Sequence, residues 1–178
     1  GCMKKWLILP LLLSLSLTAC TSGMELKKQT FTFELGADVF ANPSLYVKNP
    51  DKYDLRNAKV ISNSKGLSKV ENHFVNEQKD YLACGVYEFT LVDGRTKIPF
   101  KVKVKDTQAP NVRYNPTEIK VEKGEVPDFQ DAFQATDLSG ANYDATWDTT
   151  TSGTSNVTVR IYDRFGNSVS KEVQLVVE

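Results

Sequence analysis

The chain has 178 residues, of which 22 are basic, 22 are acidic and one is a histidine, so its formal net charge is zero at neutral pH. A chain this close to neutrality lacks the broad basic footprint typical of proteins that bind nucleic acid, and we expect no nucleic-acid partner. Its length suits one large domain or two small ones.

The first predicted element is a secretory signal. Two lysines, a twelve-residue apolar run at residues 6–17 and two small residues lead to Cys20. This order is typical of a signal peptide, here residues 1–19, and we interpret the two residues before Met3 as an expression scar or a misplaced start. A helix formed by the apolar run would be roughly 18 Å long, well short of a hydrocarbon core of about 30 Å. We therefore expect no permanent transmembrane helix.

Residues 17–20, Leu-Thr-Ala-Cys, resemble the lipobox of bacterial lipoproteins. The resemblance implies that Cys20 is lipidated and becomes the mature N-terminus, with membrane lipid as its partner. Two or more acyl chains give stable membrane anchoring. We therefore expect a lipid-anchored protein on the extracellular face of the bacterial cell envelope. An ordinary signal peptide, in which Cys20 is incidental, is the alternative.

Beyond the signal, the dominant pattern is an alternation of apolar and polar residues, which is typical of β-strands. The alternating runs occupy residues 30–35, 87–92, 98–104, 119–122, 157–161 and 173–177. Asp93-Gly94 separates two of these runs and predicts a hairpin. The lysines of residues 101–105 are interpreted as the solvent-facing side of a strand rather than as a basic stripe. No stretch keeps a helical period over three turns, so the sequence predicts an all-β fold.

The two halves of the chain repeat each other. Residues 33–36 correspond to 121–124, which lie 88 positions further on, and residues 85–89 correspond to 153–157, only 68 positions further on. The first repeat therefore carries about twenty extra residues between Asn42 and Glu77. We interpret this segment as a longer loop or a short helical connection.

A short joint separates the two repeats at residues 105–110. Pro110 holds Ala109 in an extended conformation, and a linker this short and without glycine predicts limited rotation. The predicted organisation is a signal at 1–19, a lipidated tether at 20–25, a first domain at 26–105 and a second at 106–178.

Three segments around this joint resemble the tandem Ig-like modules of Gram-positive surface proteins. They are Val-Lys-Asp-Thr-Gln-Ala-Pro at 104–110, Ala-Thr-Asp-Leu-Ser-Gly at 135–140 and Ile-Tyr-Asp-Arg-Phe-Gly-Asn at 161–167. The resemblance implies two tandem Ig-like β-sandwiches of about seven strands each, with a role in spacing, adhesion or ligand display and no catalytic residues. The alternatives are a carbohydrate- or peptidoglycan-acting enzyme subunit and a purely structural stalk.

The residue types needed for catalysis are sparse. After the signal and Cys20, Cys84 is the only cysteine, and its apolar neighbours predict a buried, inert thiol. A nucleophile needs a base, and the only histidine, His73, lies in a polar segment eleven positions away. Phosphate-binding loops, metal-ligand spacings and nucleophile elbows are not found. We expect no enzymatic activity and no cofactor.

Carboxylates gather in the second repeat. They are Asp128, Asp131, Asp137, Asp144, Asp148 and Asp163. They are spread over turns, where aspartate bonds to local backbone, rather than set at alternate positions of one loop as calcium sites often require. We therefore favour turn chemistry over a metal. If calcium stiffens the joint, Asp106 and Asp137 are the best candidate ligands.

Four aromatic residues are candidates for binding a surface glycan or protein ligand. Tyr46, Tyr53 and Phe74 lie in the extra segment of the first repeat, and loops on a rigid scaffold often carry binding sites. Trp147 alternates with polar residues and is either the core tryptophan of its sandwich or a partly exposed platform. For the first three, packing against the core is the alternative.

Overall fold

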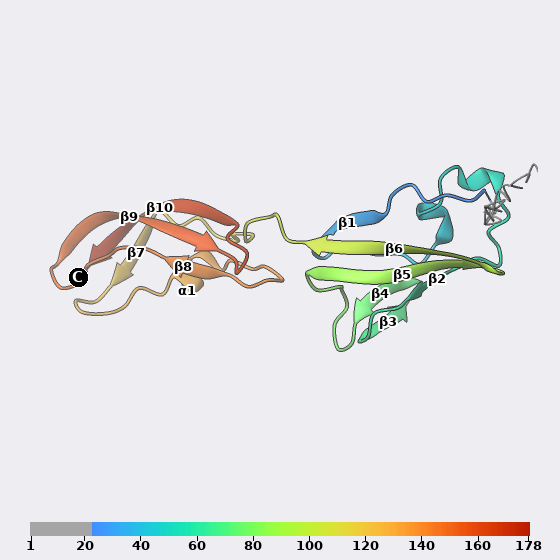
Figure 1. Ribbon diagram of the computed structural model, residues 1–178. Coiled ribbons are helices and arrows are strands. Elements are labelled where there is room, and N and C mark those ends of the chain that lie inside the picture. Colours follow the sequence, from blue (N-terminus) through green and yellow to red (C-terminus); the bar gives the residue numbers. More distant parts are fainter. Residues whose placement is uncertain (1–22) are drawn as a thin grey trace, which may run out of the picture.

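The computed structural model describes residues 23–178, so the predicted signal and Cys20 lie outside the described residues (Figure 1). Strands dominate the described chain, and the α-helix in it, α1, has five residues. No helix in residues 23–178 is long and apolar enough to cross a membrane. The predicted all-β class and β-sandwich architecture are confirmed.

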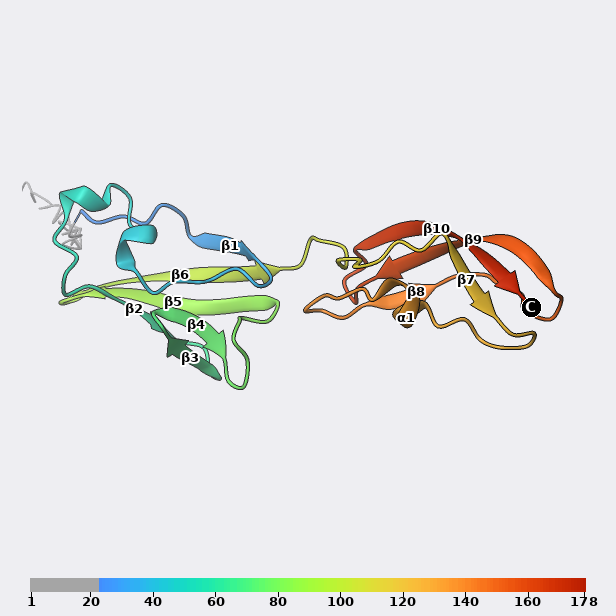
Figure 2. The same ribbon diagram turned by 180° about the vertical axis from the view of Figure 1, so that it is seen from behind.

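The elements fall into two groups, one on each side of Asp106. The N-terminal half, residues 23–105, contains β1 (Thr30–Glu34), η1 (Pro43–Leu45), η2 (Pro50–Lys52), β2 (Lys59–Ser62), β3 (Leu67–Val70), β4 (His73–Asn76), β5 (Gly85–Asp93) and β6 (Thr96–Lys105). The C-terminal half, residues 106–178, contains β7 (Glu118–Val121), α1 (Phe129–Phe133), β8 (Asn142–Asp144), β9 (Gly153–Tyr162) and β10 (Ser168–Val177). The halves follow one another along the long axis of the molecule (Figures 1 and 2).

Both halves are built on a four-stranded sheet of the same topology. The strand order is β1-β6-β5-β2 in the first and β7-β10-β9-β8 in the second. In each half the first strand along the chain, β1 or β7, pairs in parallel with the last one, β6 or β10. The last two strands along the chain, β5 and β6 or β9 and β10, form an antiparallel hairpin. The hairpin predicted at Asp93-Gly94 is present, since Asp93 pairs with Thr96 and Gly94 takes a positive φ of 59°.

The repeat seen in the sequence reappears in the strand register. Val104 of β6 pairs with Phe33 and Gly85, and Val177 of β10 pairs with Val121 and Gly153. The same offsets of 88 and 68 residues therefore connect equivalent positions in the two sheets. Because the side-chain period of a strand is two, these equivalent positions face the same way in both halves.

Each half has its own hydrophobic core. Alternate residues of the long hairpins point inward, so the first core centres on the aromatic rings of Phe89 and Phe100 and the second on Val159, Ile161 and Leu175. The two clusters share no residue among those described. Each sheet is therefore stabilised mainly by apolar burial within its own half.

The extra segment between residues 42 and 77 is a structural part of the first sandwich, not a loop or a helical connection as expected. It contains η1, η2 and the strands β2, β3 and β4. β2 extends the main sheet, and β4 joins the chain at Val39 through a hydrogen bond from the Phe74 amide to the Val39 carbonyl (2.9 Å). Four-residue strands rich in Lys, Ser and Asn carry too little periodicity to be recognised from the sequence.

The number of strands is lower than the seven per module that the resemblance implied. The described residues form six strands in the N-terminal half and four in the C-terminal half. In the C-terminal half the layer opposite the sheet consists of α1 and short pairings such as the bridge between Asn111 and Thr136. Phe133 of α1 is buried in the core, so this short helix takes a place that a strand was expected to fill.

Candidate functional site at the joint between the halves

The joint is held by side chains from both halves. Glu34, at the end of β1, accepts hydrogen bonds from the backbone N–H and the hydroxyl of Thr107, both at 2.8 Å. Asp106 accepts a bond from the Ser139 hydroxyl at 2.5 Å, and its backbone carbonyl accepts one from the Asn167 amide at 2.8 Å. The segment that leaves β6 is thus attached to two separate loops of the C-terminal half.

Asp163 is the most buried carboxylate at the joint, with 1% of its surface exposed. It accepts bonds from the backbone N–H groups of Phe165 (2.8 Å) and Asn167 (3.0 Å) and from the Asn167 side chain (2.8 Å). This is the local turn chemistry that the sequence predicted for aspartates of the second repeat. The turn positions Asn167 so that it also reaches the Asp106 carbonyl.

Three carboxylates meet at this point. One oxygen from each of Asp106, Asp137 and Asp163 lies within 4.8 Å of the other two. The structure therefore brings together the two residues singled out from the sequence, Asp106 and Asp137, and adds Asp163. A set of oxygen donors suits calcium rather than zinc. The sequence favours turn chemistry over a metal at these aspartates, and that preference stays a prediction. In this arrangement the Ser139 hydroxyl bonds to both Asp106 and Asp137.

Burial and hydrogen bonding separate the pKa values of Asp106 and Asp163. Burial raises the pKa of Asp106 above its ordinary value, and the neighbouring carboxylates Asp163 and Asp137 add to the rise. Burial alone would also raise the pKa of Asp163, but the hydrogen bonds from Asn167, Phe165 and Asp106 outweigh it and hold that pKa below its ordinary value. As the pH falls, Asp106 accepts a proton before Asp163 does.

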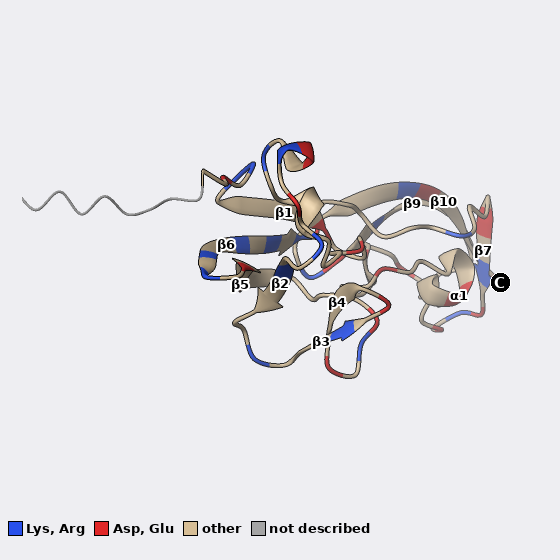
Figure 3. Cartoon of the chain, turned by 90° about the vertical axis from the view of Figure 1, so that its right-hand side faces the viewer, with Lys and Arg blue, Asp and Glu red and all other residues tan. Residues whose placement is uncertain are grey.

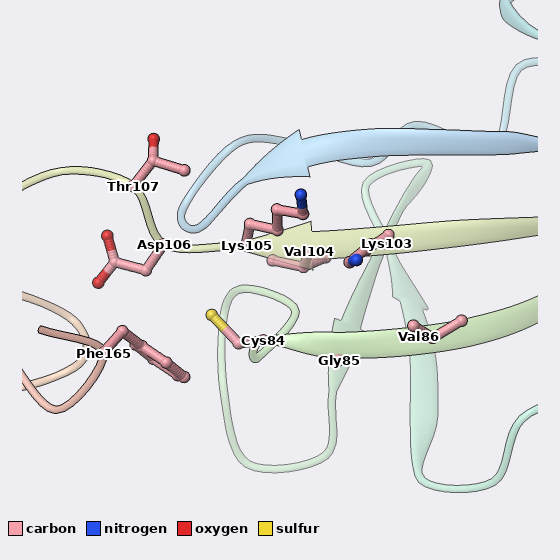
Figure 4. Close-up of a pocket in the computed structure, with 9 residues that line it drawn as sticks. All are labelled: Cys84, Gly85, Val86, Lys103, Val104, Lys105, Asp106, Thr107 and Phe165. Atoms are coloured by element: carbon pink, nitrogen blue, oxygen red, sulfur yellow. The ribbon is translucent and has the colours of Figure 1, made fainter. Parts of the chain in front are cut away.

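A pocket of about 390 Å³ lies beside the joint (Figure 4). It is lined by Cys84, Val86 and Val104 from the N-terminal half and by the ring of Phe165 from the C-terminal half, together with backbone and lysine stems of β6. Burial, and then the charge of Asp106, raise the pKa of the Cys84 thiol, so it is protonated at neutral pH. A neutral thiol is a poor nucleophile. Cys84 is only partly buried and lines this pocket, so the prediction of a buried thiol is wrong, and its inert role stays a prediction.

Two of the aromatic candidates lie in the core. Tyr46 is 1% exposed and Phe74 is 5% exposed, so the expectation that they form a ligand-binding surface is wrong. The turn η1 directs Tyr46 inward, where its ring lies 4.9 Å from those of Phe31 and Phe100. Its hydroxyl donates to the Phe40 carbonyl at 2.5 Å. The alternative of core packing holds for both residues.

The other two aromatic candidates are half-buried. Tyr53 packs against the first core, and its hydroxyl donates to the Gly23 carbonyl at 2.8 Å, which ties the start of the described chain to η2. Trp147 packs against the second core but is not fully buried, so both alternatives, a core tryptophan and a partly exposed platform, stay open. The structure brings neither residue to the joint, and ligand binding by them stays a prediction.

No protein-family model matches the chain, and no curated protein matches it. Solved structures are similar at low identity. The EC1-2 fragment of human mucin-like protocadherin is 13% identical, with a TM-score of 0.30, over 89% of this chain and 99% of the other. A three-Ig-domain structure of titin is 11% identical, with a TM-score of 0.36, over 87% of this chain and 65% of the other.

An endo-fucoidan hydrolase is 9% identical, with a TM-score of 0.33, and the match covers 87% of this chain but only 28% of the hydrolase. These likenesses concern the arrangement of strands and do not extend to ligand or activity.

Proposed function

We propose that the protein is a lipid-anchored, non-catalytic module of the bacterial cell surface that acts as a rigid spacer. Cys20 fixes one end to the membrane, and the C-terminal half is held beyond the N-terminal half, where it is available for adhesion or binding. The observation that carries the proposal is the joint. A flexible linker would let the two halves rotate freely, whereas here hydrogen bonds attach Thr107 to Glu34 on one side and Asp106 to Ser139 and Asn167 on the other.

Several contacts across the joint support this rigidity. Thr107 is tied back to β1 through Glu34, while Ser139 and Asn167 hold Asp106 from the other side. The tips of two loops also touch, since a Cβ atom placed on Gly36 would lie 3.1 Å from a methyl carbon of Leu138. Contacts on several sides of one connection restrict both bending and twisting.

The same contacts support a non-catalytic role. A carboxylate that acts in glycoside hydrolysis needs to face a second carboxylate across an accessible cleft. Asp163 instead lies inside the turn that binds it, and Asp106 and Asp137 share the hydroxyl of Ser139. The clustered carboxylates of the described chain thus serve the connection between the halves.

The spacer role predicts a narrow distribution of distances across the joint. Spin labels on cysteines introduced at Lys65 and Asn156, which are exposed and lie in different halves, would report it in a Cys84→Ala background. We expect the distribution to broaden in a Ser139→Ala variant, because Asp106 then keeps only one of the two bonds that attach it to loops of the C-terminal half, the bond from Asn167. Double electron–electron resonance makes the measurement.

The matched control for this measurement is Thr158→Ala. This change removes a comparable bond, from the Thr158 hydroxyl to Glu172 at 2.6 Å, within the hairpin of β9 and β10. It should leave the distribution unchanged. A broad distribution in the unmodified joint would show that the halves move independently, and the spacer proposal would be wrong.

Anchoring is predicted to depend on Cys20, which ends the lipobox-like segment. A Cys20→Ala variant should be released from membranes or remain uncleaved, and it should no longer incorporate a labelled fatty acid during growth. Cys84→Ala is the control, because this partly buried thiol should have no part in lipidation. Label retained by Cys20→Ala, or lost from Cys84→Ala, would contradict the prediction.

A further inference from the structure

The two halves of the protein carry opposite net charge. Residues 24–105 contain fourteen Lys and Arg against ten Asp and Glu, a net charge of +4. Residues 106–178 contain six Lys and Arg against twelve Asp and Glu, a net charge of −6. The near-neutral total therefore hides a basic half next to the proposed anchor and an acidic half beyond it.

Much of the positive charge lies on one face of the first sheet, which we call the lysine face. It consists of the outward side chains of β6 and β2, namely Lys97, Lys101, Lys103, Lys105 and Lys59. Four of these residues are exposed and Lys103 is half-buried. Figure 3 shows the resulting blue bands along β6.

Strand register places these residues together. Lys97 and Lys59 are both opposite Val92, and Lys103 is opposite Val86, so they share one face of the sheet. Lys101 has a long contact of 3.8 Å to Glu88, and no ion pair of the described chain involves the other four lysines. Glu34 of β1 also lies on this face, opposite Lys105, so five lysines stand against two glutamates and the face keeps a net charge of +3.

Exposed apolar side chains lie among the lysines. Val86 is 54% exposed and Ile61 is 44% exposed, and both point outward on the same face. A surface on which aliphatic groups stand among lysines suits the boundary between lipid headgroups and acyl chains. It suits a fully hydrated soluble polyanion less well.

The same positions of the C-terminal half are not basic. The residues equivalent to Lys97, Lys101, Lys103 and Lys105 are Ser170, Gln174, Val176 and Glu178. The topology and register of the two sheets are the same, so a β-sandwich of this kind does not need the lysines in order to fold. The difference is a property of the half that lies next to the anchor.

We propose that the lysine face binds the anionic phospholipid surface of the membrane that carries the anchor. This inference rests on the proposed lipid anchoring, since the three residues from Cys20 to Gly23 span at most about 10 Å. The hydroxyl of Tyr53 fixes Gly23 to the first sandwich, at the end of the N-terminal half that lies away from the joint (Figure 1). The tether thus starts on the half that carries the lysine face.

Binding of this kind adds a second attachment to the lipid anchor. Each lysine near an anionic bilayer strengthens binding by about fivefold, and the attraction falls off within a Debye length. The acidic C-terminal half is repelled by the same surface. The N-terminal half would lie along the headgroups, and the C-terminal half, which follows it along the same axis (Figure 1), would be kept off them by its own negative charge.

The test uses the unlipidated chain from Gly23 to Glu178, which contains both cores, with vesicles of phosphatidylcholine alone or with 30% phosphatidylglycerol added. We expect sedimentation with the anionic vesicles only, weakened by salt. A Lys101→Gln, Lys103→Gln, Lys105→Gln variant should lose about a hundredfold in partition coefficient. The matched control changes three exposed lysines outside this sheet, Lys65, Lys69 and Lys79, to glutamine, with the same loss of charge.

Equal losses from the two triple variants would show that only net charge matters, and the assignment to this face would be wrong. Binding to soluble polyphosphate without binding to vesicles would also show that the proposal is wrong. Self-association that is seen by light scattering and is abolished in the Lys101→Gln, Lys103→Gln, Lys105→Gln variant would identify a second copy as the partner instead. These outcomes do not depend on Cys20, so they are separate from the failure of the anchor itself.

Orientation on the vesicle gives a second readout. An environment-sensitive fluorophore on Val86→Cys, in a Cys84→Ala background, should shift to the blue on anionic vesicles. The same fluorophore on Val70→Cys should not, because that residue is 48% exposed but lies on β3, outside the lysine face. A shift at position 70 and none at position 86 would overturn the proposal even if the protein binds.

Discussion

Replacing Tyr46 with alanine should lower the free energy of unfolding of the N-terminal half by about 3–5 kcal/mol, the range for a large aromatic removed from a core. The Tyr46 ring contacts Phe31 and Phe100 and is almost completely buried. Such a loss is a large part of the 5–15 kcal/mol that stabilises a typical domain. Urea unfolding followed by circular dichroism measures it.

Two further variants separate packing from hydrogen bonding. Tyr46→Phe keeps the ring but leaves the Phe40 carbonyl without its donor, so it should cost about 1 kcal/mol. Tyr53→Ala should cost much less than Tyr46→Ala, because the Tyr53 side chain is only half-buried. Unchanged unfolding in Tyr46→Ala together with weaker adhesion to cells or glycans would contradict the core assignment.

Tyr46 also gives this half a pH dependence in alkali. Burial raises the pKa of Tyr46 to about 12, above the unfolded value of about 10. The folded state therefore favours the neutral phenol, and this contribution to stability is complete below pH 10 and is lost as the pH rises towards 12. Tyr46→Phe should remove that part of the alkaline loss, which unfolding measured between pH 9 and pH 12 would show.

Replacing Asp163 with alanine should destabilise the C-terminal half by about 3 kcal/mol. The change removes the acceptor of three partly buried hydrogen bonds, from the N–H groups of Phe165 and Asn167 and from the Asn167 side chain, each of which contributes about 1 kcal/mol. It should also loosen the joint, because the turn no longer holds Asn167 against the Asp106 carbonyl. Thermal unfolding measures the first effect, and the distance distribution across the joint measures the second.

The acid side of the pH profile distinguishes the two coupled carboxylates. Since the pKa of Asp163 is lowered, its stabilisation is present above the ordinary carboxyl value of about 3.9 and is lost as the pH falls through the lowered pKa. Since the pKa of Asp106 is raised, its contribution is present at low pH and is lost as the pH rises through the raised pKa. Asp106→Asn should therefore stabilise the protein at neutral pH.

The Asp106→Asn measurement is made in chelator, with Asp148→Asn as a control at an exposed turn. Equal effects of the two variants would contradict the special position of Asp106. Added calcium that raises the melting temperature of the wild type, but not that of Asp106→Asn, would show that calcium binds at the joint, against the turn chemistry that the sequence favours. If added calcium changes the melting temperature of neither protein, the joint is held by hydrogen bonds without a metal ion.

The long strands could be predicted from the sequence because their alternation extends over five or more residues, as at 87–92 and 173–177. The short strands β2, β3 and β4 could not, because they are set by pairing with distant residues rather than by their own pattern. The inward position of Tyr46 depends on the turn η1, and no periodic pattern of apolar residues predicts that turn. A tyrosine in a polar segment therefore suggested a surface site and is a core residue.

At the joint, too, part of the arrangement could be predicted from the sequence and part could not. Pro110 and the short linker indicate limited rotation, and Asp106 and Asp137 are the residues that the sequence offers as ligands if a metal stiffens the joint. Asp163 was interpreted only as a turn residue, because its distance of 57 positions from Asp106 says nothing of their contact. The three carboxylates meet because separate loops of the second sandwich end at the same place, which is a property of the topology.

The parallel pairing of the first and last strands has a mechanical consequence. In each half the chain enters through β1 or β7 and leaves through β6 or β10, and the two strands lie side by side in the same direction. A pulling force applied at the two ends of such a half slides these strands past each other. All the hydrogen bonds between them are then loaded at once, instead of opening one after another. A protein tethered to a cell that is dragged by flow would resist extension at both sandwiches.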